Sequence, residues 1–288
     1  MHLLLLLVAV LLLPVGALAV AASIMTRPAR AVVGQPPPDL PIETVAFRSG
    51  NGAMIRGWFL AGREGAGAVA LFHGVRGNRA AALPRMRFLN QAGYGVLAID
   101  FQAHGESEGD MITFGLRESL DASAAIAWLH ARTPGPIAAM GASLGGAALL
   151  VGEEPPAVDA IVLEEVYPTI DDAVARRLER HFGLLGRWIA PLYVRIGQAL
   201  TGIKPSRLRP IDQIGRLTMP VFIIGGTLDT STPIEETRAL FAAINGEREL
   251  WEVEGAGHFD LHGFVPAEYE RHVLAFLARM RAEAPVGS

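Results

Sequence analysis

The fold is decided by the stretch Ile137-Ala-Ala-Met-Gly-Ala-Ser-Leu-Gly-Gly-Ala-Ala-Leu-Leu150. The apolar residues 137–140 predict a buried strand, and residues 147–150 predict a helix. Between them, Gly141-Ala-Ser143-Leu-Gly145 has the spacing G-x-S-x-G, which is typical of a sharp turn from strand to helix. The flanking glycines lack the Cβ atoms that would clash in such a turn. The sequence therefore predicts that the Ser143 hydroxyl is presented at the edge of a sheet.

Similar apolar runs lie on both sides of this stretch. Continuous runs of this kind are typical of strands that are covered on both faces. They are Val69–Phe72, Val96–Ile99, Ala160–Leu163 and Val221–Ile224. Most are followed by a segment of helical length, such as the one from about Leu116 to Ala131, whose apolar residues recur every three or four positions. The alternation predicts an α/β fold with a mostly parallel central sheet and helices on both faces.

Two segments depart from this alternation. Glu43–Phe47 and Met54–Leu60 flank a glycine-rich turn and predict an antiparallel pair before the parallel strands. About fifty residues then separate the strand ending near Glu165 from the one that begins after Pro220, which is too long for an ordinary crossover. We expect this insertion, about residues 166–218, to form a helical lid.

The lid contains apolar residues at helical spacing, and two interpretations fit them. They pack the lid onto the body, or part of them lines a pocket for an acyl chain. On the second interpretation Trp188, Leu192 and Tyr193 are candidates for substrate binding.

A serine hydroxyl is a weak nucleophile near pH 7, so it needs a general base and an acid that orients the base. The strand at 221–224 leads into Asp229, and the segment Glu249–Val253 leads into His258. Both residues follow strands and are expected at the same sheet edge as Ser143. We predict Ser143 as nucleophile, His258 as base and Asp229 as the orienting acid, with the backbone N–H of Leu144 facing the developing anion.

Other residues compete for these roles. His262 is an alternative base, and Asp260 and Asp212 are alternative acids. His73 and His104 follow strands and are expected to be structural. Glu164 and Glu165 end a strand beneath the lid, where they would bond to the lid or contact a substrate amine. His262 lies four residues after His258, but Gly255-Ala-Gly257 favours a flexible loop that delivers His258, and neither Asp260 nor Asp212 directly follows a buried strand.

Four motifs carry a resemblance to a known family. They are His73-Gly74 after a strand, Asp100-Phe-Gln-Ala-His-Gly-Glu-Ser107, the turn around Ser143, and the pair Asp229 and His258. Over about residues 42–280 the chain resembles the α/β-hydrolase superfamily, in the branch of bacterial esterases, monoacylglycerol-lipase-like and serine-aminopeptidase-like proteins. The order Ser, Asp, His is that of the superfamily. The resemblance implies the α/β-hydrolase fold and a second oxyanion N–H from Val75.

The second motif departs from the family. Similar proteins usually have Arg-Gly-His-Gly where this chain has Gln102-Ala103-His104-Gly105. The departure concerns local contacts of this loop and leaves the three predicted catalytic residues untouched.

The first 25 residues form a separate segment, because the chain from Leu3 to Met25 is apolar and uncharged. At about 1.5 Å per residue it is long enough to cross a hydrocarbon layer of roughly 30 Å. Two interpretations fit: an uncleaved membrane anchor followed by Arg27 and Arg30, or a cleaved signal peptide, which would export the protein. Residues 26–41 then predict a proline-rich spacer, and residues 42–284 the hydrolase domain.

Composition excludes several classes of protein. The chain has 288 residues, 51% of them hydrophobic and 19% charged, which fits one domain with a large core. A net charge of -4 and scattered arginines predict no nucleic-acid partner, and the absence of cysteine excludes a thiolate nucleophile. No metal-binding or nucleotide-binding spacing occurs, so we expect no metal and no cofactor. The sequence leaves the oligomeric state open.

Together these patterns predict a serine hydrolase that cleaves an acyl bond in a small-molecule substrate, with a carboxylic ester as the expected bond. A peptidase or a thioesterase with the same three residues is the alternative, because all three share an acyl-enzyme. From another class, the chain could be a membrane-tethered binding module on a hydrolase scaffold without activity.

Overall fold

The computed structural model describes the backbone of residues 2–282 and the side chains of residue 13 and residues 15–279. The strands of its central sheet are β2 (Ile42–Arg48), β3 (Met54–Leu60), β4 (Ala68–Phe72), β5 (Gly95–Asp100), β7 (Ile137–Ala142), β8 (Ala160–Glu164), β9 (Val221–Gly226) and β10 (Arg248–Val253). A short parallel pair joins β1 (Ala29–Arg30) to β6 (His104–Gly105).

The helices follow the strands in the alternation that the sequence predicts. They are α1 (His2–Thr26), α2 (Leu83–Gln91), α3 (Glu118–Arg132), α4 (Leu144–Leu150), α5 (Ile170–Phe182), α6 (Leu184–Thr201), α7 (Pro210–Gln213), α8 (Ile234–Ala242), α9 (Leu261–Phe264) and α10 (Pro266–Ala282), with short 3-10 turns η1 (Arg79–Ala82), η2 (Pro205–Arg207) and η3 (Ile214–Arg216).

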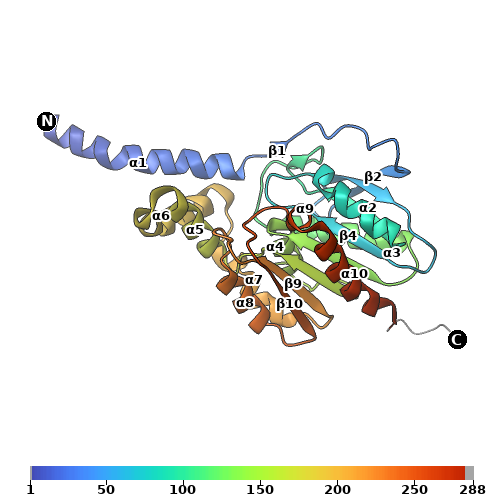
Figure 1. Cartoon of the computed structure of the whole chain (residues 1–288). Coiled ribbons are helices and arrows are strands. Elements are labelled where there is room, and N and C mark those ends of the chain that lie inside the picture. Colours follow the sequence, from blue (N-terminus) through green and yellow to red (C-terminus); the bar gives the residue numbers. More distant parts are fainter. Residues whose placement is uncertain (1, 283–288) are drawn as a thin grey trace.

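Within the described residues the central sheet has eight strands in the order β10-β9-β8-β7-β4-β5-β3-β2 (Figure 1). Neighbouring strands are parallel except β2 with β3 and β3 with β5. The predicted antiparallel pair is confirmed as β2 and β3, with Ile42 opposite Leu60. The mostly parallel α/β class is confirmed as well.

The two faces of the sheet are covered by different helices because side chains alternate along each strand. On β4, Val69 and Leu71 pack into an apolar cluster with α2 and α10, whereas Ala70 and Phe72 pack into a cluster with α3 and α4. Burial of both faces explains why these strands are continuously apolar in sequence. Helices on both faces, as predicted, therefore complete three layers.

The order of the strands places a crevice at one edge of the sheet. β4 has β5 on one side and β7 on the other, and the chain visits β5 before it crosses back to β7. Loops that leave β4 and β7 therefore diverge, which is the arrangement that opens a ligand site in α/β sheets. Residues His73–Val75 follow β4, and Ser143 follows β7.

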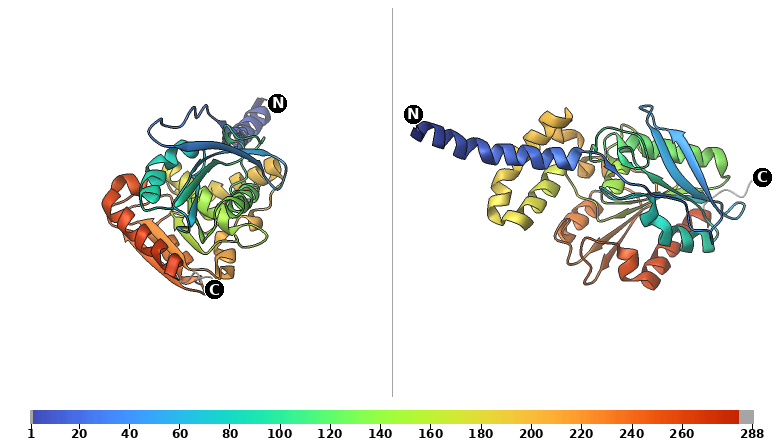
Figure 2. Two further views of the ribbon diagram at one scale, coloured as in Figure 1. Left: turned by 90° about the vertical axis from the view of Figure 1, so that its right-hand side faces the viewer. Right: turned by 90° about the horizontal axis from the view of Figure 1, so that it is seen from above.

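The insertion between β8 and β9 contains α5 and α6, which pack against each other. The insertion is helical, as predicted: of the two helices, α5 carries most of the charged residues, and α6 is the more apolar. Figures 1 and 2 show the pair beside α1, on the side of the molecule opposite the C-terminus. The end of α1 nearest the body contacts α6, where Ala22 is 1% exposed.

The segment after α1 lies against the body. The Arg30 guanidinium donates to the carbonyl oxygens of Ser107 and Gly109 at 2.9 and 2.8 Å, and the N–H of Val33 donates to Glu106 at 3.1 Å. Together with the β1–β6 pairing, these bonds hold the start of the predicted spacer in one place.

Among the residues whose placement is described, no helix combines the length and the apolar character needed to cross a bilayer. Part of the predicted membrane segment, residues 3–25, lies outside the described side chains.

The loop that departs from the family pattern has its own contacts. Gln102 donates from its backbone and its side chain to the two oxygens of Asp121, at 2.8 and 3.0 Å, and accepts from Asn51 at 2.8 Å. Burial raises the pKa of Asp121 to about 7, against the hydrogen bonds that it accepts. Gln102 therefore ties the loop after β5 to α3.

The approach of α4 to β4 generates a stability prediction. A Cβ built on Gly145 would lie 2.2 Å from the carbonyl oxygen of Phe72, whereas one built on Gly197 in α6 would meet no described atom within 4 Å. Gly145→Ala should cost about 2 kcal/mol or more and lower Tm by roughly 5 °C. Gly197→Ala should leave Tm unchanged or raise it, because alanine favours helix. Thermal unfolding followed by circular dichroism checks both, and equal Tm values for the two variants would contradict the packing argument.

Candidate active site

Ser143 lies in a strained turn between β7 and α4. Its backbone has φ 49° and ψ -109°, a conformation that residues other than glycine rarely adopt. The N–H of Ser143 donates to the Glu164 carbonyl at 2.8 Å, and its carbonyl accepts from Ala147 at 2.9 Å. Strain of this kind persists only when the surrounding structure holds it, and it is common at functional sites. The side chain stays half-buried, so the hydroxyl is accessible.

The loop after β4 lies directly over this turn. A Cβ built on Gly74 would be 3.7 Å from the Cβ of Ser143, so the next residue, Val75, stands beside the serine. Leu144 begins α4 and is buried. Among the described residues, neither Val75 nor Leu144 has a hydrogen-bond acceptor for its N–H. Two free N–H groups beside a serine, one of them at a helix N-terminus, can bind an oxyanion.

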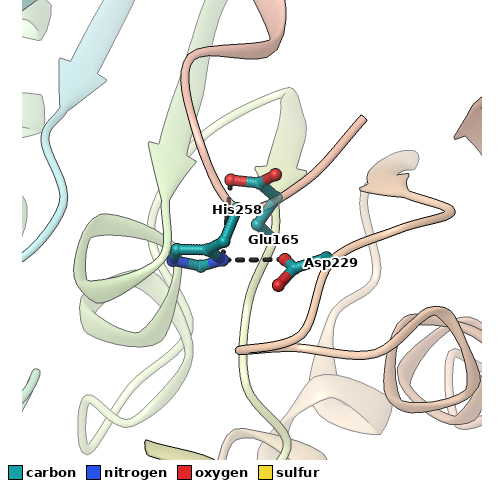
Figure 3. Close-up of side chains that lie close together, drawn as sticks. All are labelled: Glu165, Asp229 and His258. Carbon is teal, nitrogen blue, oxygen red and sulfur yellow. Dashed lines mark hydrogen bonds and ion pairs between the residues drawn. The ribbon is translucent and has the colours of Figure 1, made fainter. Parts of the chain in front are cut away.

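His258 is oriented by Asp229. The Nδ1 atom of His258 lies 2.7 Å from Oδ2 of Asp229, as Figure 3 shows. The Asp229 side chain is fully buried, whereas that of His258 is 29% exposed. Because Nδ1 is engaged, Nε2 is the atom free to take a proton. This is the arrangement of a histidine base and an orienting carboxylate.

Asp229 is held by its own loop. Oδ1 accepts the N–H groups of Ser231 and Thr232 at 2.6 and 2.9 Å, and Oδ2 accepts the Thr232 hydroxyl at 2.5 Å. Burial raises the pKa of Asp229, but the hydrogen bond and charge of His258 and the bonds of Thr232 outweigh burial, so the pKa lies below its usual value. Asp229 is therefore a carboxylate at neutral pH.

A cavity of about 690 Å³ joins these groups. Ser143 and His258 both line it, as do Val75 and Leu144. No hydrogen bond joins Ser143 to His258 among the described residues, and such bonds are often long before substrate binds. The predicted nucleophile, base and oxyanion-binding groups thus meet at a single cavity, and Asp229 lies behind His258, outside the cavity lining.

The charges on the cavity wall are unevenly matched. Glu164 and Asp260 both pair with Arg85, at 2.8 and 2.7 Å. On α5, Arg177 and Arg180 have no carboxylate partner among the described residues, and Arg180 donates to the Ser231 hydroxyl at 3.2 Å. Positive charge without a described carboxylate partner therefore lies at the solvent-exposed, lid side of the cavity.

Comparison with known proteins places this geometry in a family. A family model described as X-Pro dipeptidyl-peptidase (S15 family) matches residues 48–179. Protein YqkD of Bacillus subtilis is 25% identical over 246 residues, which cover 83% of this chain and 81% of YqkD. The Pyrococcus furiosus esterase Pf2001 has a TM-score of 0.74 and 27% identity, covering 88% of this chain and 98% of that one. The chain belongs to the α/β-hydrolase superfamily. At the level that esterase and peptidase relatives share, it is a serine hydrolase.

Human ABHD12B is a more distant relative of this hydrolase. It is 27% identical over 206 residues, which are 64% of this chain and 52% of ABHD12B. The resemblance read from the motifs is thereby confirmed at the level of the superfamily, and the branch within it stays a prediction.

The lid residues predicted to bind substrate occupy different places in the hydrolase. Tyr193 lines the cavity, and burial raises the pKa of its hydroxyl against the opposing charge of Arg177. Trp188 and Leu192 are 84% and 41% exposed and are not among the lining residues. The structure therefore brings Tyr193 alone of the three to the cavity wall.

The alternative acids and bases are engaged elsewhere. His262 is buried and bonds to Glu270 at 2.9 Å, and Asp212 pairs with Arg209. Asp260 pairs with Arg85, as described above. None of these three contacts the imidazole of His258 or replaces Asp229 beside it.

His73 and His104 have structural hydrogen bonds, as expected. Nε2 of His73 accepts the N–H of Phe101 at 3.1 Å, so Nδ1 carries the proton and donates to Gly74 at 2.8 Å. Burial, followed by the charge of His104, lowers the pKa of His73 to about 3. This ring is neutral at ordinary pH and holds the loop that carries Val75.

The expectation that Glu164 and Glu165 bond to the lid is wrong for Glu164. It accepts from Arg85 of α2 at 2.8 Å and from the Tyr269 hydroxyl of α10. Glu165 instead lies at the predicted general base, with Oε2 3.7 Å from Nδ1 of His258 (Figure 3). Sequence reasoning missed this role, although the place of Glu165 directly after a strand between β7 and β9 was a usable signal.

The ligand atoms of Glu165, Asp229 and His258 lie within 4.8 Å of one another, close enough to surround a cation. The donor chemistry fits a hydrogen-bonded histidine better. Nδ1 already bonds to Asp229, and Glu165 holds its proton at neutral pH, since burial and the charges of Asp229 and Glu164 raise its pKa to about 9.

Proposed function

We propose that the chain cleaves carboxylic esters through an acyl-enzyme, with Ser143 as nucleophile, His258 as general base and Asp229 as the orienting acid. One observation carries the proposal: a strained, accessible Ser143 lines the same cavity as His258, whose other ring nitrogen bonds to Asp229 at 2.7 Å. Scattered structural histidines and serines do not produce this combination.

In the first step the Ser143 oxygen attacks the ester carbonyl carbon while His258 Nε2 takes the hydroxyl proton. The carbonyl oxygen becomes an anion beside the N–H groups of Val75 and Leu144, each worth about 3 kcal/mol of the barrier in comparable sites. The tetrahedral intermediate collapses, the bond to the alcohol oxygen breaks, and His258 returns its proton to the leaving alcohol.

In the second step a water molecule attacks the acyl-enzyme. His258 takes a proton from the water, the bond between the acyl carbon and the Ser143 oxygen breaks, and the proton returns to Ser143. Asp229 stabilises the imidazolium in both steps and keeps Nδ1 protonated, so that Nε2 faces the serine. No further group is needed to balance protons.

The charges of the cavity favour an ester over the peptide of an aminopeptidase. A free α-ammonium needs a carboxylate partner, but Glu164 and Asp260 are paired with Arg85, and Glu165 is uncharged at neutral pH. The unmatched lid charges are those of Arg177 and Arg180, which repel an ammonium group. A thioester stays compatible with this wall.

For location, we propose that residues 3–25 attach the hydrolase to a membrane. The support is the uncharged apolar sequence of this segment and the packing of its last residues, Ala22 and Met25, against the body. Cell fractionation with N-terminal sequencing of each fraction decides between this anchor and export after cleavage. If the protein in the soluble fraction lacked residues 3–25, this segment would be a cleaved signal peptide and not an anchor.

Replacement of the nucleophile gives the direct test. Ser143→Ala should lower hydrolysis of p-nitrophenyl butyrate at least about a thousandfold and abolish labelling by a fluorophosphonate probe. Ser123→Ala, on α3 and outside the cavity, is the matched control and should keep both. Labelling that persists in Ser143→Ala would place the nucleophile elsewhere. No turnover and no labelling of the unmodified protein would favour a binding module without activity.

A panel of substrates tests the bond type. Esters and thioesters of one acyl group should be cleaved, and the aminoacyl anilide of similar size should be cleaved at least about a hundredfold more slowly, because its ammonium meets unmatched arginines. Steady-state kcat/KM values at pH 7 provide the comparison. An anilide cleaved faster than the ester would make the chain a peptidase.

The two lid aromatics provide a matched pair. Tyr193→Ala should raise KM for p-nitrophenyl octanoate about tenfold, because a cavity-lining aromatic contributes roughly 1.5 kcal/mol of apolar contact, and should change the acetate ester little. Trp188→Ala should change neither. Equal effects of the two variants would show that Tyr193 has no special contact with the acyl chain. A steady fall in the rate of hydrolysis from acetyl to octanoyl esters in the unmodified protein would exclude a long acyl pocket.

A further inference from the structure

Glu165 is a buried carboxyl group that faces the imidazole of His258, and one of its two oxygens has no hydrogen-bond partner among the described residues. Glu165 is 6% exposed, and its Oε2 atom lies 3.7 Å from Nδ1 of His258. Its Oε1 atom has no hydrogen-bond partner among the described residues. Buried polar groups are nearly always bonded, so an orphaned oxygen beside a catalytic group calls for a functional explanation. Figure 3 shows Glu165 and Asp229 approaching the ring from different strand ends.

The backbone holds Glu165 in this place. It follows β8, which lies between β7, with Ser143 at its end, and β9, with Asp229 beyond its end. The N–H of Glu165 donates to Ile224 of β9 at 2.9 Å, and its φ is 51°, an unusual value for a residue with a side chain. That conformation directs the side chain away from the line of the strand and toward the imidazole. Backbone strain of this kind is common where it positions a functional group.

We infer that Glu165 is a second positioning residue for His258, able to accept the Nδ1–H hydrogen bond when the carboxylate of Asp229 is removed. The inference rests on the proposed function, since it assigns a role toward the general base. A movement of about 1 Å would bring Oε2 from 3.7 Å to ordinary hydrogen-bond distance. Removal of the Asp229 side chain vacates the space for that movement.

The surroundings of Glu165 explain why Asp229 and not Glu165 acts in the unmodified protein. The charged groups that face it are Asp229, Glu164, His258 and, from α2, Arg85. Burial, then the charges of Asp229 and Glu164, raise its pKa to about 9, and the hydrogen bond from the Phe259 backbone and the charge of Arg85 offset only part of this. Two carboxylates at a single imidazole do not both ionise readily, so Glu165 holds its proton while Asp229 is charged. Without Asp229, one source of repulsion disappears and Glu165 ionises at lower pH.

The experiment compares Asp229→Ala with the double variant Asp229→Ala/Glu165→Gln, using kcat/KM for p-nitrophenyl butyrate from pH 6 to pH 10. Asp229→Ala should lose about a hundredfold or more at pH 7 and regain part of it as pH rises. The double variant should be at least about tenfold slower than Asp229→Ala at pH 9 and should not show that recovery. The matched control, Asp229→Ala/Glu270→Gln, removes a glutamate that bonds to His262 and should behave like Asp229→Ala.

Nitrogen NMR of the imidazole adds a readout that a structural role would not move. In Asp229→Ala the Nδ1–H tautomer of His258 should persist, and in the double variant it should give way to a mixture. Equal kcat/KM values for Asp229→Ala and the double variant at every pH would overturn the inference. The proposed function would still stand if the unmodified protein cleaved the ester and Ser143→Ala did not.

A second measurement keeps the inference testable if Asp229→Ala does not fold. Between its ordinary pKa of 4.5 and about 9, folded Glu165 holds a proton that the unfolded chain releases, so its stabilising contribution is lost as pH rises through this window. The difference in Tm between Glu165→Gln and the unmodified protein should therefore shift in favour of Glu165→Gln as pH rises from 5 to 9. An exposed control, Glu247→Gln, should show no such trend. A constant difference for Glu165→Gln would mean that Glu165 is charged throughout, and the inference would fall.

Discussion

The close approach of α4 to β4 and β7 is the constraint on which the site depends. Gly145 and Gly146 pack so tightly that a Cβ at either would come within 2.2 Å of Phe72 or Val166. With α4 this near the sheet, the chain can enter it from β7 only through a turn with positive φ at Ser143. The same packing aims the helix N-terminus, with the Leu144 N–H, at the space above the serine. The conformation of the proposed nucleophile and the position of the proposed anion-binding N–H thus both depend on one close contact.

The three neighbouring carboxyl groups have different electrostatic surroundings. Glu164 pairs with Arg85, the pKa of Asp229 lies below its usual value, and burial with the charges of Asp229 and Glu164 raises the pKa of Glu165 to about 9. The hydrogen bonds that Asp229 accepts and the charge of His258 outweigh the burial of Asp229, whereas the groups that favour a charged Glu165 do not outweigh its burial. As a result the imidazole of His258 faces a single negative charge.

Much of the architecture is predictable from sequence, because buried parallel strands are apolar runs and catalytic groups follow their ends. Ser143, Asp229 and His258 could be chosen on this basis, and the structure brings His258 into contact with Asp229 and onto the cavity that Ser143 lines. Other features depend on distances that no local pattern encodes. The role of Glu165 follows from a positive φ after β8, and the difference between Tyr193 and Trp188 follows from the rotation of α6 about its axis.

The end of α1 belongs to the wall of the main cavity as well as to the N-terminal segment. Met25 lines the main cavity, and Ala22, Met25 and Thr26 line a smaller apolar hollow of about 60 Å³ beneath α6. The N–H of Ile112 donates to the Thr26 carbonyl at 2.8 Å, which fixes this end of the helix. A shortened protein that began at Arg27 would lack Met25 from the main cavity and Ala22, Met25 and Thr26 from the smaller hollow. A change at these three residues is therefore also a change to the inner surface of the hydrolase.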